Sequence, residues 1–246
     1  MEVEFKDAEL FKRIMETVGS LMADVSLDFT EDGFSIKAMD PANIAMIMFQ
    51  GAKGLFNSFN VENNTKLSVS LDDLNSILKL LKKDDRLRLT DSKNKLNLDI
   101  SGKNKLHFAI PLIDENYTAQ KVPQLKFSAE VTLLSALLKE AIKAGFLVDD
   151  SLYLTVEGQR VILSAKSEEK EFTEDLSIND NREIFNVKSE AITRSKYSID
   201  YLAKFLTSLD PDKPVRMSFS NNYPLKLEYE LSTNANMSFI LANRIE

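Results

Sequence analysis

Hydrophobic residues recur along the chain with two periods, and the switches between these periods divide it into strands and helices. Alternating apolar residues predict strands with one buried face, whereas apolar residues three or four positions apart predict amphipathic helices. The strand pattern covers residues 2–5, 25–30, 34–39, 44–49, 66–70, 86–90, 95–100 and 105–110, and then 127–131, 152–156, 161–165, 172–178, 185–188, 215–219, 225–231 and 237–242. The helical pattern covers residues 10–21, 71–81, 132–144 and 199–209.

Most connections between the predicted strands have the length of a hairpin. Hairpins join antiparallel strands, so we expect antiparallel sheets with few helices gathered on one side, which is an α+β fold. Each half of the chain is expected to follow the order β-α-β-β-β twice.

Residues 111–127 carry two of the six prolines and no apolar periodicity, which is typical of an extended, exposed connector. The segments on its two sides resemble each other. A helix that starts after Ser70 is echoed by one after Ser198, and a strand turn at Gly33 is echoed at Gly158 with nearly the same separation. We therefore expect an internal duplication, with an N-terminal domain over residues 1–110, a connector over 111–127 and a C-terminal domain over 128–246.

The composition agrees with two globular domains. A chain of 246 residues is long enough for both, and 43% hydrophobic and 28% charged residues are globular values. No apolar run approaches the roughly 18 residues of a membrane span, and the N-terminus lacks the regions of a signal peptide. Cysteine is absent, so we expect a cytoplasmic protein without disulfides.

Residue types that catalysis requires are scarce. His107 is the single histidine, and without cysteine or a second histidine it cannot head a zinc site, so a structural role in its strand is favoured. No glycine-rich phosphate-binding motif occurs. Asp72 and Asp73 follow Ser70 at a helix start, where acids stabilise the helix dipole. We expect no catalytic residue, no metal site and no cofactor, and hence a protein that is not an enzyme.

The net charge of −7 by itself argues against a nucleic-acid partner. The positions of the basic residues along the chain matter more than this sum. Each predicted helix carries basic residues opposite its apolar stripe. On a single helix such residues usually serve solubility, but a duplication places four equivalent helices on one side of the molecule. A shared basic face would hold duplex DNA through its phosphates, without reading sequence. The residues expected to face DNA are Lys12, Arg13, Lys79, Lys82, Lys83, Lys139, Lys143 and Lys204.

Residues 36–47, IKAMDPANIAMI, resemble the AMDP-x-x-V signature of the proliferating cell nuclear antigen family of sliding clamps, in its archaeal form. Similar sequence at 110–114, 195–202, 223–229 and 240–245 extends the resemblance over the whole chain. It implies the DNA clamp fold, in which three subunits form a ring around duplex DNA with sheets outside and helices inside. A closed ring is a topological tether, so it acts as a processivity factor in replication and repair, associated with the archaeal nucleoid.

The resemblance also implies partners: DNA polymerase, the clamp loader, flap endonuclease and DNA ligase. These proteins dock through a short peptide, the PCNA-interacting motif, whose apolar and aromatic anchors enter a pocket under the connector. Two positions depart from the family, because Asn243 replaces a usual proline and Gln120 replaces an apolar residue of some relatives, so partner preference is expected to differ. The pocket residues would be Met39, Ile44, Val122, Pro224, Ala242 and Asn243.

Two predicted edge strands carry opposite charges. Lys103 and Lys105 make the end of the first half basic, whereas five acids crowd residues 168–175. Unlike edges favour head-to-tail pairing between copies, although charges on edge strands also serve simple edge protection. The residues expected at the subunit interface are Lys105, Leu106, Phe108, Ile110, Glu171, Phe172, Glu174 and Leu176.

Two other readings stay open from the sequence. The chain could be one subunit of a heterotrimeric clamp, because related clamp subunits have similar sequences. A hydrolase on a duplicated α+β scaffold is the remote alternative. Such an enzyme should show clustered acids or a histidine site at strand ends, and we find neither.

Overall fold

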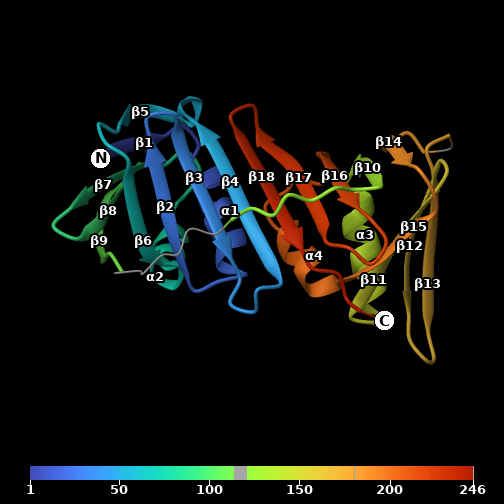
Figure 1. Ribbon diagram of the computed structural model, residues 1–246. Helices are drawn as coiled ribbons and strands as arrows, with labels where there is room; N and C mark the ends of the chain where they lie inside the picture. Colours follow the sequence, from blue (N-terminus) through green and yellow to red (C-terminus); the bar gives the residue numbers. More distant parts are fainter. Residues whose placement is uncertain (114–120, 180, 246) are drawn as a thin grey trace. The chain divides into compact units, whose positions relative to one another are not determined.

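The computed structural model describes residues 1–113, 121–179 and 181–245, and its contacts divide the chain into two compact units (Figure 1). Of the described residues, the first unit contains 1–41, 47–113 and 231–236. The second contains 42–46, 121–179, 181–230 and 237–245. The domain boundaries at 110 and 128 describe the duplication rather than these contact groups, and they stay a prediction.

Apart from one short 3-10 helix in the first half, the two halves of the chain have the same order of helices and strands. The first half consists of β1 (Glu2–Phe5), α1 (Ala8–Gly19), β2 (Asp24–Thr30), β3 (Gly33–Met39), β4 (Ala45–Ala52), the 3-10 helix η1 (Lys53–Leu55), β5 (Phe56–Asn60), β6 (Thr65–Ser70), α2 (Leu71–Leu78), β7 (Arg86–Ser92), β8 (Lys95–Ser101) and β9 (Lys105–Pro111). The second half consists of β10 (Ala129–Leu134), α3 (Ser135–Phe146), β11 (Ser151–Glu157), β12 (Arg160–Lys166), β13 (Glu171–Ser177), β14 (Ile184–Ser189), β15 (Thr193–Ser198), α4 (Ile199–Phe205), β16 (Pro214–Phe219), β17 (Leu225–Ser232) and β18 (Ala235–Leu241).

The sheets repeat as the elements do. Strands of the first half run in the orders β5-β1-β7-β8-β9 and β4-β3-β2-β6, and those of the second half in the orders β14-β10-β16-β17-β18 and β13-β12-β11-β15. Every strand of the first half thus has its counterpart nine strands later. Pairings such as β7 with β8 and β11 with β12 are antiparallel. The predicted α+β fold and the predicted duplication are both confirmed.

Alternating burial along the strands and apolar faces on the helices build a core in each unit. Asp7 caps α1 by accepting a hydrogen bond of 2.9 Å from the Leu10 amide, and the face that follows is buried. In the first unit the rings of Phe29 and Phe34 stack with centroids 4.9 Å apart. In the second unit those of Phe205 and Phe239 stack at 4.3 Å. These cores fix the helices against their sheets.

Two strands were missed by the sequence pattern. β5 has only two apolar residues and is mostly exposed, so no alternation marks it. β15 buries the small polar residues Thr193 and Ser195 beside Tyr197, and polar residues on the buried side hide the alternation. Each half therefore has more strands than the predicted order of elements.

Some predicted boundaries were also wrong. The strand expected at 127–131 is β10, and the helix expected at 132–144 is α3, so both elements lie slightly later in the chain. The helix expected at 199–209 ends at Phe205. Leu206 and Leu209 are buried in the turn that follows, so their apolar spacing extended the prediction beyond the helix.

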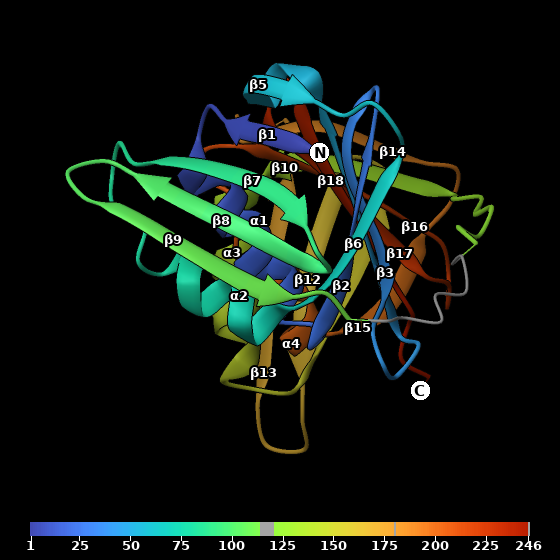
Figure 2. The ribbon, with the colours of Figure 1, turned by 90° about the vertical axis from the view of Figure 1, so that its left-hand side faces the viewer.

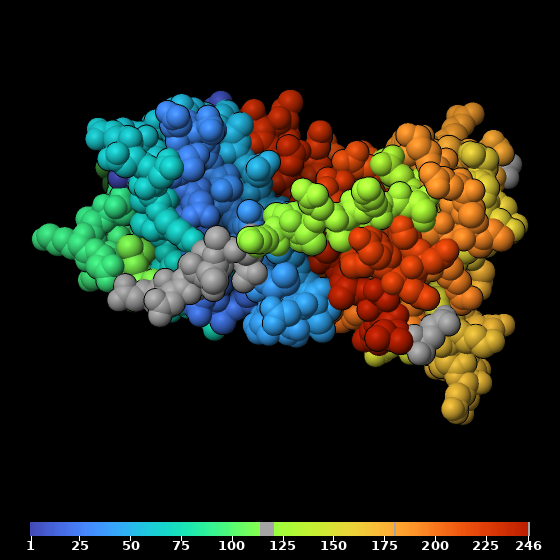
Figure 3. Space-filling model, viewed as in Figure 1, coloured from blue at the N-terminus to red at the C-terminus, as the bar shows by residue number. Residues whose placement is uncertain are grey.

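The described parts of the connector agree with the predicted extended, exposed segment. Ile113 donates a backbone hydrogen bond of 2.8 Å to Ser68 in the first unit. Residues 121–127 have no regular secondary structure and are largely exposed on the surface (Figure 3). Gln120 lies outside the described residues.

Candidate DNA, peptide and subunit-contact surfaces

The helices of the first unit, α1 and α2, pack against each other and carry the first group of predicted DNA-facing residues. On α1, the ammonium of Lys12 lies 3.5 Å from a carboxylate oxygen of Glu9, and Arg13 is half-buried. Lys79 caps the C-terminus of α2 and is exposed. The structure therefore leaves Lys79 more open to solvent than Lys12 or Arg13.

Lys82 and Lys83 were predicted to lie on a helix, and this was wrong: both lie in the turn after α2. α2 ends at Leu78; beyond it, the Asp85 side chain accepts a hydrogen bond of 3.0 Å from the Lys82 amide, and Asp84 has a positive φ of 71°, which is not helical. Leu81 is buried in this turn and continues the apolar spacing of α2, which is why the sequence predicted a longer helix. Both lysines are exposed.

In the second unit, α3 and α4 also pack against each other, but their lysines differ in environment. The ammonium of Lys139 donates to the carbonyl of Leu209, and burial lowers the pKa of Lys139. Lys204 forms an ion pair of 2.7 Å with Asp200, one helical turn earlier. Lys143 is exposed in the last turn of α3. Of these three lysines, Lys143 is the most accessible to a phosphate.

The predicted peptide-binding residues of the second unit include two exposed apolar side chains, Ile44 and Val122, with exposed fractions of 39% and 42%. The Ala242 amide donates a hydrogen bond of 2.9 Å to the Ile44 carbonyl, so these two predicted residues lie together. Pro224 and Asn243 are half-buried. In the first unit, Met39 is half-buried at the end of β3.

The sequence pattern did not single out Arg244, which fixes the segment after β18. Its amide donates to the Lys196 carbonyl at 2.8 Å. Its guanidinium donates to the Asp150 carboxylate and, at 2.9 Å, to the Ser151 hydroxyl. The hydrogen bond from Arg244 is the largest cause that lowers the pKa of Asp150 to about 2. No motif could have revealed the ion pair of Arg244 with Asp150, because these two residues are 94 positions apart in the chain.

Both strands predicted for subunit contact are sheet edges. β9 is the outermost strand beside β8 (Figure 2), and β13 is the outermost strand beside β12 (Figure 1). On β9, Lys105 and Leu106 are exposed and Phe108 is half-buried, but Ile110 is buried within its own unit. An edge strand offers unpaired backbone groups to another chain.

β13 is less acidic at its edge than the sequence suggested. Glu171 pairs with Lys166 at 3.3 Å, and Asp175 pairs with Arg160. Among the ion pairs of the described residues, none includes Glu174. Burial, followed by the charge of Glu140, raises the pKa of Glu174. Phe172 is half-buried and Leu176 is buried. Because Glu171 and Asp175 form ion pairs, Glu174 is the carboxylate of β13 that has none among the described residues.

Exposed apolar residues beside each edge strand were not predicted as contact residues. Leu80 follows α2, which packs against β9, and it is 48% exposed. Phe146 and Leu147 end α3, which packs against β13, and they are 50% and 75% exposed. Leu80, Phe146 and Leu147 come just after the last buried apolar residues of their helices, where the helical spacing of apolar residues ends. Large exposed apolar side chains next to an open edge are typical of a protein contact.

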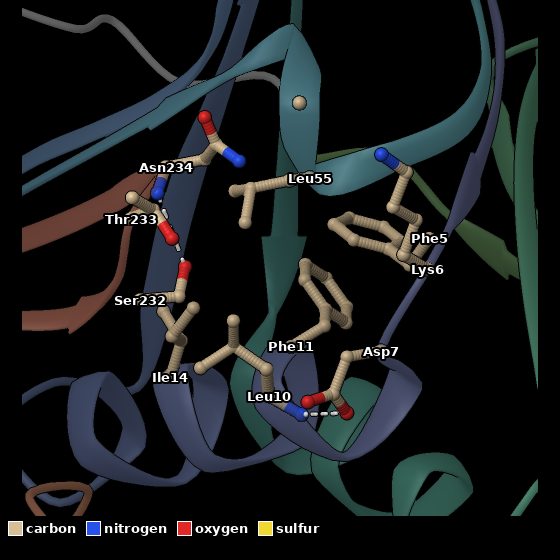
Figure 4. Close-up of a pocket in the computed structure, with 11 residues that line it drawn as sticks. Phe5, Lys6, Asp7, Leu10, Phe11, Ile14, Leu55, Ser232, Thr233 and Asn234 are labelled. Carbon is tan, nitrogen blue, oxygen red and sulfur yellow. Dashed lines mark hydrogen bonds between the residues drawn. The ribbon is translucent and has the colours of Figure 1, made fainter.

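A separate pocket of about 200 Å³ lies in the first unit, at the start of α1 (Figure 4). Phe5, Phe11 and Leu55 contribute apolar walls, and Asn234 lies at its rim. No predicted site residue lines it. No group of three or more histidine, cysteine, aspartate or glutamate residues in the described part of the chain could hold a metal ion. Within that same part, no helix is long and apolar enough to cross a membrane.

Residues 1–114 match the family model of the N-terminal domain of proliferating cell nuclear antigen. The DNA polymerase sliding clamp of Pyrococcus horikoshii is 30% identical over 246 residues, covering 100% of this chain and 98% of the relative. That of Nanoarchaeum equitans is 33% identical over 249 residues, covering 99% of each chain. The chain belongs to the proliferating cell nuclear antigen family. As a member of that family it is a DNA sliding clamp, a scaffold protein and not an enzyme.

Solved sliding clamps have the same fold. The crystal structure of PCNA from Thermococcus kodakaraensis has a TM-score of 0.94 at 25% identity and covers 99% of each chain. The PCNA2–PCNA3 complex from Sulfolobus tokodaii matches with a TM-score of 0.90 at 27% identity over 100% of each chain. A PCNA from A. fulgidus bound to the C-terminal region of FEN-1 has a TM-score of 0.90 at 24% identity, which shows the fold alone. The predicted clamp fold is confirmed.

Proposed function

We propose that this sliding clamp works as a ring of three copies around duplex DNA and tethers DNA polymerase and other replication and repair enzymes to it. The observation that carries the proposal is the pair of unlike open edges, β9 and β13, each flanked by exposed apolar residues. Two different patches that fit each other generate head-to-tail assembly, which closes into a ring when the rotation per subunit allows it. A ring needs no tight DNA site, because it cannot leave a long duplex sideways.

The duplication supports the pairing of β9 with β13 of a neighbouring copy. The counterparts of these two strands are β18 and β4. Within the first unit, the Ala52 amide at the end of β4 donates 2.9 Å to the carbonyl of Asn234, just before β18. Within the second unit, the Ala242 amide just after β18 donates 2.9 Å to the carbonyl of Ile44, just before β4. We expect β9 and β13 to form the same kind of backbone hydrogen bonds between copies.

The interface would draw its affinity from backbone pairing and apolar contact. Leu106 and Phe108 of one copy would meet Phe172 of the next on the inner face, with Lys105 near Glu171 on the outer face. Ile110 and Leu176 are buried in their own units, so their role would be to hold the two edges in shape. Exposed ion pairs contribute only about 0–1 kcal/mol each, so they would orient the contact rather than dominate it.

The helices and the turn after α2 would supply the phosphate contacts. Lys79, Lys82, Lys83 and Lys143 are exposed and could approach a duplex directly. Lys12, Arg13, Lys139 and Lys204 are partly engaged within the chain, so we expect smaller contributions from them. Such contacts would be independent of sequence, as a sliding protein requires.

Partner proteins would dock on the second unit near the connector through peptides with apolar and aromatic anchors. The exposed side chains of Ile44 and Val122, with Ala242 bonded to Ile44 and Asn243 next in the chain, form the proposed binding surface, and Pro224 is the further residue of the second unit assigned to it. The partners expected from family membership are DNA polymerase, the clamp loader, flap endonuclease and DNA ligase, with the protein working at the nucleoid in the cytoplasm. The amide of Asn243, in place of proline, should shift the preference among them.

The exposed lysines provide a test of DNA encirclement. Lys79→Ala, Lys83→Ala and Lys143→Ala combined should weaken retention on DNA and flatten its salt dependence, since each lost phosphate contact lowers the slope by about 0.9. A matched triple variant, Lys93→Ala, Lys95→Ala and Lys188→Ala, removes three exposed lysines that lie away from the helices. Equal retention and equal polymerase stimulation for both variants at moderate salt would contradict the assignment.

A second arrangement stays open, in which the chain is one subunit of a heterotrimeric ring. It is favoured by the similarity to the PCNA2–PCNA3 complex, which contains two different clamp subunits. The same edges would then pair with those of a related chain. The mass of the isolated protein in solution separates the two arrangements.

A further inference from the structure

The C-terminal segment 242–244 is held at both ends within the second unit. At one end, the Ala242 amide is bonded to the Ile44 carbonyl at 2.9 Å. At the other end, the Arg244 amide is bonded to the carbonyl of Lys196 on β15, an edge strand of its sheet. Asn243 lies between these two anchors. The position of the segment beside Ile44 therefore depends on how firmly Arg244 is held.

The side chain of Arg244 is bound to a prearranged acceptor. Its guanidinium donates to the Asp150 carboxylate and to the Ser151 hydroxyl, which lies 2.9 Å away. Asp150 also accepts a hydrogen bond of 2.8 Å from the Ser151 hydroxyl. The Asp150 carbonyl accepts a hydrogen bond of 3.0 Å from the Ile199 amide at the start of α4. The acceptor is thus fixed to the core of the unit by β11 and α4.

We propose that Arg244 is a positioning residue for partner peptides: its ion pair with Asp150 holds Ala242 and Asn243 beside Ile44 in the conformation that a peptide with apolar anchors binds. This role rests on the proposed peptide surface at Ile44 and Val122. A preformed surface binds more tightly than one that must be ordered during binding, because ordering a segment costs conformational entropy. Arg244 itself need not touch the peptide.

The ion pair is partly exposed, with exposed fractions of 38% for the Arg244 side chain and 69% for that of Asp150. Exposed pairs have modest energies, so the effect on binding should also be modest. We expect Arg244→Gln and Asp150→Asn each to weaken the binding of a synthetic peptide that carries the PCNA-interacting motif by about three- to fivefold. The double variant should bind no more weakly than either single variant, because both remove the same contact.

Three comparisons separate positioning from a general loss of structure. Arg244→Lys keeps a cation at this place and should recover part of the affinity. Arg216→Gln removes a comparable exposed pair in the same unit, Arg216 with Glu228 at 2.9 Å, and should leave peptide binding unchanged. Amide hydrogen exchange at Ala242 and Arg244 should accelerate in Arg244→Gln, whereas exchange in β11 should not.

Calorimetric titration of the full chain with the peptide decides the proposal. A matrix of the wild type, Arg244→Gln, Asp150→Asn, their combination and Ile44→Asp is sufficient. Wild-type affinity in Arg244→Gln, together with lost binding in Ile44→Asp, would overturn the role of Arg244 and leave the peptide surface standing. Undiminished binding to Ile44→Asp would overturn the peptide surface itself, and the role of Arg244 with it.

Discussion

β9 and β13 occupy equivalent kinds of position, yet they offer different surfaces. Each is an outermost strand, and each packs against a helix whose C-terminal end or following turn carries exposed apolar side chains. β9 presents Lys105 and, on its exposed face, no acid, whereas β13 presents Glu174 without an ion pair among the described residues. If the two edges were alike, a two-fold dimer would satisfy both. Because they differ, each edge fits the other one on a second copy, and assembly continues around a ring.

The largest effect should come from the apolar part of β9. Phe108→Asp places a charge where the proposed contact excludes water, and losing an anchor of this kind costs about 2–4 kcal/mol. The trimer should dissociate into folded single chains, as measured by light scattering and circular dichroism. Phe185→Asp is the matched control, because Phe185 is also exposed, on the edge strand β14. A Phe108→Asp protein that keeps the mass of a trimer would exclude β9 from the interface.

The apolar residues beside β13 should matter nearly as much. Leu147 is 75% exposed in the single chain, so Leu147→Asp should leave the fold intact. If the residue is buried in the ring, the variant should weaken assembly by about tenfold or more, since an anchor is lost. Sedimentation velocity over a range of concentrations measures the change. If Leu147→Asp assembles like the wild type, Leu147 lies outside the interface, and the contact is made by β13 alone.

The charges should have a smaller effect, and one that salt removes. Lys105→Glu should weaken assembly up to about fivefold at low ionic strength, because an exposed ion pair contributes about 0–1 kcal/mol. At high salt the variant and the wild type should converge, since exposed charges are screened. Lys95→Glu on β8 provides the control for a change of net charge alone. A difference that persists at high salt would indicate a structural effect instead.

The smallest effect should be that of pH. The pKa of Glu174 is raised in the single chain by burial and by Glu140, so the folded chain retains this proton more readily than an unfolded one. Contact with a lysine of the neighbouring copy would favour the charged carboxylate, so assembly would then release the proton and weaken as the pH falls through the raised pKa. Glu174→Gln should remove this part of the pH dependence. Equal pH dependence in wild type and variant would assign it to other groups.

The sequence predicted the fold well because the pattern of burial is regular in most elements. Clear alternation identified β2, β3, β11 and β12, and the repeated turns revealed the duplication. The pattern failed at β5, which is mostly exposed, and at β15, whose buried side carries small polar residues. It also placed Lys82 and Lys83 on a helix, because buried Leu81 continues the apolar spacing after α2 ends.

The sites depended on information that a pattern lacks. Residue types alone could place lysines on helices. They could not show that the Lys139 ammonium donates to the carbonyl of Leu209, or that Arg160 pairs with Asp175. The partners of Arg244 come from β11 and β15, far away in the chain. Such contacts between distant segments arise only when the sheets form.

The mass of the isolated chain in solution tests the central claim most directly. Light scattering at micromolar concentration and moderate salt, without any other protein, should give three times the chain mass of 27.8 kDa. That result would mean that one kind of chain supplies both edges of every contact in the ring. A mass near 27.8 kDa for a folded protein would contradict the account of a ring made from three copies of this chain.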